Sequence, residues 1–302
     1  MSQPEADLRV QPATDDDRAS ALGLVFAHFP TEERERRIAQ ALGCDDAAGS
    51  TVWTAYRGEK LAAAALVVVL PGKTAIISPP RPSGQQTPET IRELLVQIVA
   101  MPPRQGVRLA QVFLPNDRRA EEPIFIEAGF RCAATLSYLV SLSGTFPATR
   151  PNDDVEFMPY SPSLHERLAQ VVEQTYAGSL DCPSIDQVRA IEDVLDGYRA
   201  AGVFDPARWL IVRRRGNNVG CLLLADDPAN NQWELTYMGV IPAARGRGVG
   251  GAIVRHAQWL AAQAGRERLV LAVDANNEPA IAVYAAANFI QWDVRRLFLR
   301  VL

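Results

Sequence analysis

Cysteine and histidine are scarce in this sequence, with four and three residues among 302. The four cysteines form no C-x-x-C pair and are scattered along the chain, at Cys44, Cys132, Cys182 and Cys221. This spacing argues against a zinc ligand set and against a disulfide framework. We therefore expect reduced thiols and no bound metal.

Long apolar runs and an excess of basic charge are also missing. The longest apolar run, residues 61–70, is too short to span a bilayer, and the first residues lack the regions of a signal peptide. The net charge is −4 and the pI is about 5.5, so no basic field attracts nucleic acid or an anionic membrane. We expect a cytoplasmic protein without either partner, and the sequence carries no signal for an oligomeric state.

What the chain does contain is a glycine-rich, doubly basic stretch, residues 237–252, which reads YMGVIPAARGRGVGGA. A strand-like run leads into it and a helix-like run follows. Glycines let successive backbone N–H groups turn toward a ligand, and a helix N-terminus adds partial positive charge. Arg245 and Arg247 add full charges. The stretch predicts a loop that binds a phosphate-bearing cofactor.

Two other phosphate-binding loops compete with this interpretation. A Walker A loop requires Lys and then Ser or Thr after its last glycine, and the chain has small apolar residues there. A dinucleotide fingerprint is spelled by Gly246, Gly248 and Gly251, with Asp274 ending the next strand-like run. Against it, residues 242–245 separate the strand from the first glycine, whereas a dinucleotide loop turns tightly at the strand end. Dinucleotide binding stays open as a distant alternative.

The pattern basic-x-x-Gly-x-Gly fits better, with Arg245, Gly248 and Gly250 after the strand residue Val240. It closely resembles motif A of the GNAT acetyltransferase superfamily, in which the loop cradles the pyrophosphate of acetyl-CoA. The resemblance implies acetyl-CoA as co-substrate. It places the cofactor contacts at Met238, Val240, Arg245, Gly246, Arg247, Gly248, Val249, Gly250, Gly251, Asn277 and Ala280.

A second signature of the same family follows in residues 273–290. It is similar in its Asn277, its helix with Tyr284, and its closing Phe289. Asn288 stands where the family has glycine. Asn tolerates the left-handed conformation of a helix C-terminus better than most residues do, so the turn is expected to form.

The order of expected elements divides the chain. Turn-formers and prolines at residues 143–153 predict a boundary between residues 1–147 and 148–302. In the second half we expect a strand, two helices, three strands, a helix, a strand, a helix and a strand, the order of the GNAT fold. Capping boxes are expected to start the first two helices at Ser163 and Ser184. The predicted class is α+β, with two tandem GNAT-fold domains, each a mixed, mostly antiparallel sheet flanked by helices.

The first half repeats this order without the chemistry. Where the second half has its glycine-rich loop, the first has ISPPRPSGQQTPET, with one glycine, Gly84, and four prolines that lack an N–H. Phe125 stands five residues before Phe130, as Tyr284 stands before Phe289. We interpret residues 1–147 as a degenerate GNAT-like copy. The arrangement resembles the tandem, mycothiol-synthase-like members of the family.

Two residues are candidates for proton transfer in the second half. Alternation predicts that Glu234 shares a strand face with Thr236 and Met238, and it lies where several family members carry a general base. The alternative is a solvated strand residue. Tyr284 resembles the family tyrosine that acts as general acid near the CoA sulfur, and the alternative is a core residue.

The resemblance therefore implies an acetyl-CoA-dependent N-acetyltransferase that acetylates a primary amine of a small molecule or peptide by direct attack in a ternary complex. The acceptor site is expected around residues 176–183. There Asp181 is either a ligand for an ammonium or a turn residue, and Asp274 is either a second carboxylate or a turn cap. Cys182 has no histidine placed to activate it, which disfavours an acyl-enzyme. A non-catalytic acyl-CoA-binding or sensing module is the alternative function.

Overall fold

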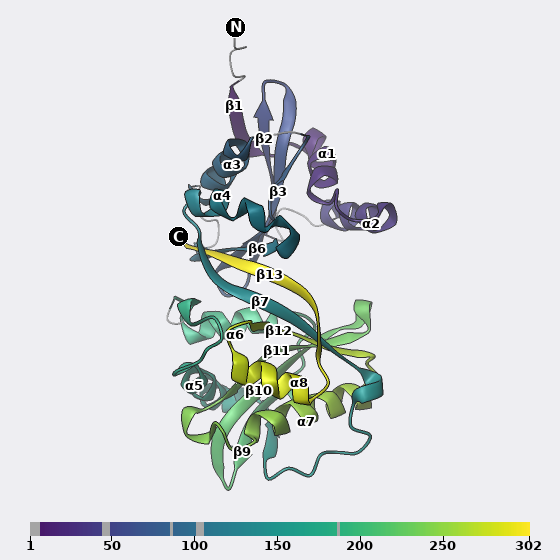
Figure 1. The fold of residues 1–302 in the computed structure, drawn as a ribbon, viewed down its shortest axis with the longest axis vertical. Helices are drawn as coiled ribbons and strands as arrows, with labels where there is room; N and C mark the ends of the chain where they lie inside the picture. Colours follow the sequence, from purple (N-terminus) through teal and green to yellow (C-terminus); the bar gives the residue numbers. More distant parts are fainter. Residues whose placement is uncertain (1–6, 44–48, 85–86, 101–105, 186–187) are drawn as a thin grey trace. The chain divides into compact units, whose positions relative to one another are not determined.

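The computed structural model describes residues 7–43, 49–84, 87–100, 106–185 and 188–302. The chain forms two compact units (Figure 1). Unit 1 runs to Ala133 and also includes Arg296–Leu302, and unit 2 is Ala134–Arg295. Most of strand β7, Arg131–Leu142, therefore belongs to unit 2, and the end of β13, Ile290–Val301, belongs to unit 1. The compact units thus divide the chain at residues other than the expected boundary after residue 147.

Unit 2 contains a sheet in the order β7-β12-β11-β10-β9-β8, in which only the pairing of β11 with β12 is parallel. The strands are β8 Glu156–Pro159, β9 Trp209–Arg214, β10 Asn217–Asp227, β11 Gln232–Val240 and β12 Arg268–Asp274. The helices are α5 His165–Tyr176, α6 Ile191–Arg199, α7 Val249–Gln263 and α8 Glu278–Ala286. The expected order of elements is confirmed.

Helices cover both faces of this sheet, which explains why its central strands are almost entirely apolar. On β9, Leu210 and Val212 pack with α7, whereas Trp209 and Ile211 pack with α5. Strand β10 divides its side chains between the same two clusters. A strand buried on both sides reads as a continuous hydrophobic run instead of an alternating one.

Unit 1 has the same order of elements, apart from an additional two-residue strand, β5. The strands are β1 Leu8–Pro12, β2 Ser50–Arg57, β3 Lys60–Leu70, β4 Thr74–Ile77, β5 Arg81–Pro82 and β6 Leu109–Pro115. The helices are α1 Asp15–Val25, α2 Thr31–Leu42, α3 Pro88–Ala100 and α4 Glu122–Glu127. The sheet runs β1-β2-β3-β4-β6 with the end of β13 beside β6, and among the pairings of β1, β2, β3, β4 and β6 only that of β4 with β6 is parallel.

The expected starts of α5 and α6 are wrong. Helix α5 begins at His165 and its N-cap, Leu164, makes no side-chain capping bond, because the preceding residues Pro162–Leu164 form a 3-10 turn. Helix α6 begins at Ile191, seven residues after Ser184, which itself lies in the 3-10 turn Pro183–Ile185. Gln187, the other member of the second expected box, lies outside the described residues.

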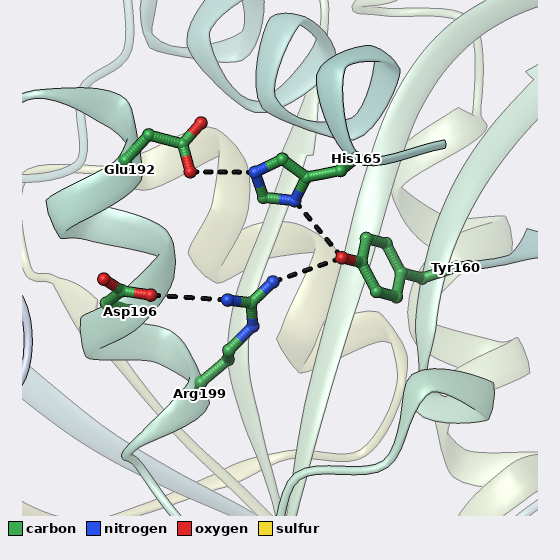
Figure 2. Close-up of polar contacts among 5 residues, drawn as sticks. All are labelled: Tyr160, His165, Glu192, Asp196 and Arg199. Atoms are coloured by element: carbon green, nitrogen blue, oxygen red, sulfur yellow. Dashed lines mark hydrogen bonds and ion pairs between the residues drawn. The ribbon is translucent and has the colours of Figure 1, made fainter. Parts of the chain in front are cut away.

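A polar network on the surface of unit 2 holds α6 against α5 (Figure 2). The Nε2 atom of His165 lies 2.8 Å from an oxygen of Glu192, and its Nδ1 atom lies 3.2 Å from the Tyr160 hydroxyl. Arg199 donates to the same hydroxyl at 3.2 Å and to Asp196 at 3.3 Å. The network supplements the packing of the buried Leu195, so polar and apolar contacts together hold α6.

Two properties of the described residues bear on the classes considered from the sequence. No helix among them is both long and apolar enough to cross a membrane. No group of three or more His, Cys, Asp and Glu side chains in the same part of the chain is arranged to hold a metal ion.

Candidate active site

Unit 2 contains a cavity of about 420 Å³ between the ends of β11 and β12. Its walls are the end of β11, the glycine-rich loop of residues 245–251, the start of α8 and part of the segment before α6. The lining includes most of the cofactor residues expected from the sequence: Met238, Val240, Arg245, Gly246, Gly248, Val249, Gly250, Gly251, Asn277 and Ala280. The candidate acid Tyr284 also lines the cavity, whereas Arg247 and Glu234 are not among its lining residues. The structure thus brings the two sequence signatures together in one cavity.

The cavity exists because β11 and β12 separate. The two strands are paired at only three positions, the last of which joins Glu234 to Val270. Just beyond, the register of β11 against β10 shifts, which leaves Thr236 without a partner in a β-bulge. A bulge bends its strand and increases the local twist. The bulge therefore directs the rest of β11 away from β12 and opens the space between them.

The bulge also corrects the expected strand face. Alternation predicts that Glu234, Thr236 and Met238 share one side of the sheet, but Met238 packs with Leu235 in the cluster on the α7 side. Tyr237 packs instead in the cluster on the α5 side. One extra residue reverses the alternation, so Glu234 and Met238 lie on opposite faces.

The glycine-rich loop presents a row of backbone donors. Gly246 and Gly248 have φ values of +71° and +80°, a conformation that glycine adopts without strain. Helix α7 begins at Val249, directly after Gly248. Within the described part of the chain, the N–H groups of residues 246–251 donate no hydrogen bond. Such donors at a helix N-terminus fit the pyrophosphate of acetyl-CoA.

The two arginines of the loop differ in what they contact. Arg245 donates to three backbone carbonyls, those of Val240 at 3.0 Å, Gly178 at 2.9 Å and Thr175 at 2.9 Å. The side chain of Arg247 is exposed and forms no ion pair or hydrogen bond with the described residues. Arg247 is therefore the loop cation that is available to a phosphate.

Glu234 is half-buried on β11, opposite Ala225 on β10 and Val270 on β12. Burial raises the pKa of its carboxyl group, and the nearby carboxylate of Asp227 raises it further. Its carboxylate forms no hydrogen bond or ion pair with the described residues. A half-buried carboxylate without a partner is able to accept a proton.

Tyr284 projects from α8 into the cavity and is only 5% exposed. Burial raises the pKa of its phenol, and the charge of Asp181 is the second cause. The phenol is therefore protonated at neutral pH. The turn after α8 forms as expected, because Asn288 has a φ of +60° and the N–H of Phe289 donates to the Tyr284 carbonyl at 3.0 Å.

Asn277 caps α8, since its Oδ1 atom accepts from the N–H of Ala280 at 3.3 Å. Both residues line the cavity, so the capping role that the sequence left as an alternative is present together with the expected position. The sequence signature thus marks a residue that builds the wall of the cavity.

Hydrogen bonds join Asp274 to Asp181 and to the next residue, Cys182. The N–H of Asp274 donates to Asp181 Oδ1 at 2.9 Å, and Asp274 accepts from the N–H groups of Cys182 and Asn276 at 3.3 and 2.9 Å. Asp274 is 2% exposed. Of the two interpretations of Asp274 from the sequence, the turn cap is the one that the contacts support.

Tyr138, from the first half of the sequence, is a neighbour of the site that no sequence motif indicates. It lies on β7 directly opposite Ala272, a cavity-lining residue of β12. The Arg295 guanidinium lies 5.0 Å from the centre of its ring, and Trp292 meets the ring edge-on at 5.9 Å. Burial raises the pKa of Tyr138, and Glu234 is among the charges that raise it. The sequence around Tyr138 indicates a strand, but it does not indicate that this strand pairs with β12, which is distant in the chain.

Comparison with known proteins identifies the class to which this site belongs. Residues 174–289 match the sequence model of the acetyltransferase (GNAT) family. That segment contains the glycine-rich loop, β11, β12 and α8. Residues 174–289 are therefore an acetyltransferase domain of the GNAT family, and the prediction from the two signatures is confirmed.

Curated relatives narrow the comparison. The chain is 35% identical over 105 residues to a mycothiol acetyltransferase of Clavibacter sepedonicus, a match that covers 34% of each chain. It is 32% identical over 108 residues to the mycothiol acetyltransferase of Paenarthrobacter aurescens (strain TC1), covering 33% of this chain and 32% of the relative. The matches thus span about a third of the length of these relatives.

Solved structures share the fold along almost the whole chain. A GCN5-related N-acetyltransferase from Sphaerobacter thermophilus has a TM-score of 0.62 at 17% identity, over 97% of this chain and 95% of that one. A tandem GNAT protein from the clavulanic acid biosynthesis pathway has a TM-score of 0.55 at 13% identity, over 98% of both. The predicted tandem GNAT fold is confirmed.

Proposed function

We propose that unit 2 transfers an acetyl group from acetyl-CoA to a primary amine of a small molecule or peptide, by direct attack in a ternary complex. The observation that carries this proposal is the cavity of about 420 Å³. The glycine-rich loop, with its unbonded N–H groups, and the buried side chain of Tyr284 both line this cavity.

The cofactor residues have separate roles in this proposal. The N–H groups of residues 246–251 and the Arg247 side chain bind the pyrophosphate, because both are free of other partners in the described chain. Met238, Val240 and Ala280 pack in the apolar cluster behind the cavity and line its wall. When bound, acetyl-CoA supplies an activated thioester.

Glu234 removes the proton from the acceptor. An alkyl amine with a pKa near 10 is mostly protonated at neutral pH and cannot attack a carbonyl in that form. A carboxylate whose pKa is raised by burial is a stronger base than an exposed one. We infer that Glu234 accepts this proton directly or through one water molecule.

Tyr284 protonates the leaving thiolate. Its phenol keeps its proton at neutral pH because burial raises its pKa, and it faces the cavity from α8. The adjacent Phe289 ring, with its centroid 5.6 Å from that of Tyr284, helps to fix the orientation of the phenol. A fixed donor at the leaving group is the arrangement that general acid catalysis needs.

The surroundings of the histidines and of one cysteine favour direct attack over an acyl-enzyme. Burial raises the pKa of the Cys221 thiol to about 12, so it is not a thiolate at neutral pH. In unit 2, His165 is bonded to Glu192 and Tyr160, and His256 is stacked on Phe157 at 3.6 Å. Both imidazoles are thus engaged elsewhere. The names of the curated relatives, mycothiol acetyltransferases, support a small-molecule acceptor for this chain.

The proposal is tested by titrating acetyl-CoA into the whole chain calorimetrically and by screening a library of primary amines for release of free CoA thiol. We expect one acetyl-CoA per chain and turnover with at least one amine. Binding without turnover across the library would favour the sensing module. The absence of acetyl-CoA binding would contradict the proposal, and NADH serves as the control for dinucleotide binding.

A further inference from the structure

The side chain of Arg245 connects the glycine-rich loop to the segment that follows α5, and the proposed reaction needs both beside the cavity. It belongs to the glycine-rich loop, but its three nitrogens donate to carbonyls elsewhere in unit 2. One carbonyl, that of Val240, is at the end of β11. The other two, of Thr175 and Gly178, lie in the last turn of α5 and just beyond it. Arg245 therefore connects the loop to the segment that follows α5.

This arrangement suits a guanidinium and no other side chain. A planar fork with several fixed N–H donors reaches three acceptors at once, whereas an ammonium is a compact point charge. The carbonyls at the C-terminus of α5 also carry the negative end of the helix dipole, which favours a cation there. The charge of Arg245 is thus compensated by backbone dipoles, and the charge of Arg247 is not.

The segment of residues 177–182, which we call the acceptor segment, is held at its other end as well. Asp181 accepts from the N–H of Asp274, and Asp274 accepts from the N–H of Cys182. Gly178, Leu180 and Asp181 line the cavity. The acceptor segment therefore runs along the cavity from Arg245, beside β11, to Asp274, at the end of β12.

We propose that Arg245 is a positioning residue that couples acetyl-CoA binding on the glycine-rich loop to the order of the acceptor segment. The inference rests on the proposed function. The loop residues that bind the pyrophosphate begin immediately after Arg245, so fixing them also fixes the guanidinium and the two carbonyls that it holds. Arg245 then acts on the acceptor side of the cavity and is not itself a phosphate ligand.

The test is hydrogen–deuterium exchange of the amides of residues 177–182 with and without acetyl-CoA, together with the acetyl-CoA Kd. In the wild type we expect acetyl-CoA to slow this exchange by about fivefold or more, because opening of the segment becomes less favourable. In Arg245→Gln and Arg245→Lys the slowing falls below about twofold while the Kd changes by less than about threefold. Arg247→Gln weakens acetyl-CoA binding by about tenfold and keeps the slowing at saturating ligand.

Arg213→Gln is the matched control, because Arg213 also donates to a backbone carbonyl, that of Gly216 at 2.8 Å, and the charge change is the same. It is expected to leave both readouts as in the wild type. The lysine variant separates charge from geometry. If Arg245→Gln loses affinity as Arg247→Gln does and lysine restores it, Arg245 is a phosphate ligand and the inference is overturned.

Two further outcomes are decisive. If the ligand slows exchange equally in the wild type and in Arg245→Gln, the coupling does not pass through Arg245. If the wild type does not bind acetyl-CoA, the proposed function fails. Exchange in the ligand-free proteins then still tests whether Arg245 orders the acceptor segment. Faster exchange of residues 177–182 in Arg245→Gln than in Arg213→Gln supports this positioning role of Arg245, and equal exchange overturns it.

Discussion

Each unit contains one parallel strand pair that is paired at only three positions. The two units differ in what lies beyond the paired positions. In unit 2 the opening beyond β11 and β12 is a cavity lined by the glycine-rich loop. In unit 1, Arg118, just after β6, donates to the carbonyls of Pro79 and Pro80, just after β4, at 3.3 and 2.8 Å. Arg118 is also paired with Glu121. The same strand arrangement thus ends at a cavity in unit 2 and at an internal polar bridge in unit 1.

The helix that follows each pair gives a second comparison. In both units the N–H of the closing phenylalanine donates to the carbonyl five residues earlier at 3.0 Å, from Phe130 to Phe125 and from Phe289 to Tyr284. Gly129 has a φ of +85° where Asn288 has +60°. The backbone turn is therefore the same, and only the phenol is absent from unit 1. Turn chemistry preserves a fold independently of the residues that would perform a reaction.

Volume alone does not distinguish the units. Unit 1 has its own cavity of about 430 Å³, lined by residues of β1, β2, β3, β4 and α3. Its walls are mainly apolar, with Trp53, Ile77 and Ile98 among them, and beyond Ile77 they include no described residue of the segment that replaces the glycine-rich loop. The row of unbonded N–H groups in the glycine-rich loop distinguishes the cavity of unit 2, and we therefore interpret unit 1 as a degenerate copy.

The largest expected effect comes from removing the base. Glu234→Gln keeps the shape of the side chain but cannot accept a proton, so kcat/KM for the acceptor is expected to fall by about 100-fold or more. Glu156→Gln, at an exposed position on β8, is the control and should leave turnover unchanged. Turnover of Glu234→Gln within about threefold of the wild type would show that Glu234 is a structural residue.

The comparison of the two loops is tested by a matched pair of glycine substitutions. Gly248 and Gly84 have φ values of +80° and +72°, and an added Cβ meets no atom within 4 Å at either position. Valine is therefore strained to a similar degree in both. Gly248→Val is expected to raise the acetyl-CoA Kd by about tenfold or more, which is about 1.4 kcal/mol, and Gly84→Val should not change it. A comparable loss from Gly84→Val in a calorimetric titration would mean that unit 1 also binds the cofactor.

Exchanging the aromatic residues sharpens the second comparison. Tyr284→Phe removes the proposed proton donor and should lower kcat by about tenfold or more, with little change in the acetyl-CoA KM. Phe125→Tyr places a hydroxyl in the core of unit 1, where Phe125 is fully buried against Phe298. An unpaired buried hydroxyl costs about 1–3 kcal/mol of stability, so this variant should unfold at lower urea concentration without gaining activity. Unchanged kcat in Tyr284→Phe would assign the phenol to packing.

The polar bridge of unit 1 predicts a loss of stability without a loss of cofactor binding. Arg118→Ala removes charge-assisted bonds from two carbonyls and from Glu121, at an expected cost of about 1–3 kcal/mol. Arg119→Ala is the control, because the Arg119 side chain is 68% exposed and its ion pair to Glu122 is expected to contribute less than about 1 kcal/mol. Urea unfolding measures both, and equal stability of the two variants would show that the bridge does not stabilise unit 1.

The smallest expected effect is a shift in pH dependence. Because the pKa of Glu234 is raised, the protonated and inactive form persists to higher pH than for an exposed carboxyl, and kcat/KM should rise as pH rises through that pKa. Asp227→Asn removes a charge that raises this pKa, so the rise of kcat/KM on the acid side of the pH profile should move to lower pH. If the pH at which kcat/KM rises is unchanged in this variant, a group other than Glu234 controls the pH dependence.

The same shift has the opposite sign for stability. The folded state binds the Glu234 proton more tightly than the unfolded state, so stability is lost as pH rises through this window. Glu234→Gln is thus expected to have a higher Tm than the wild type at neutral pH and a similar Tm in acid. The residue that raises activity would then be one that lowers stability.

The sequence by itself determined what depends on local chemistry. The glycine-rich loop, the left-handed turn at Asn288 and the order of strands and helices follow from residue type and periodicity within short windows. The two halves could be recognised as related for the same reason. The starts of α5 and α6 were predicted incorrectly because a capping pattern also occurs in 3-10 turns, such as Pro162–Leu164, that precede a helix.

Only the tertiary structure decided which distant segments meet. Tyr138 lies beside the site because β7 pairs with β12, about 130 residues later in the chain, and no local pattern specifies that pairing. The bulge at Thr236 arises from the register between β11 and β10, and it places Glu234 and Met238 on opposite faces. Two of the three carbonyl partners of Arg245 come from the end of α5 and the segment just after it, outside its motif. A motif indicates which residues are present in a site, whereas long-range pairing determines where their side chains point.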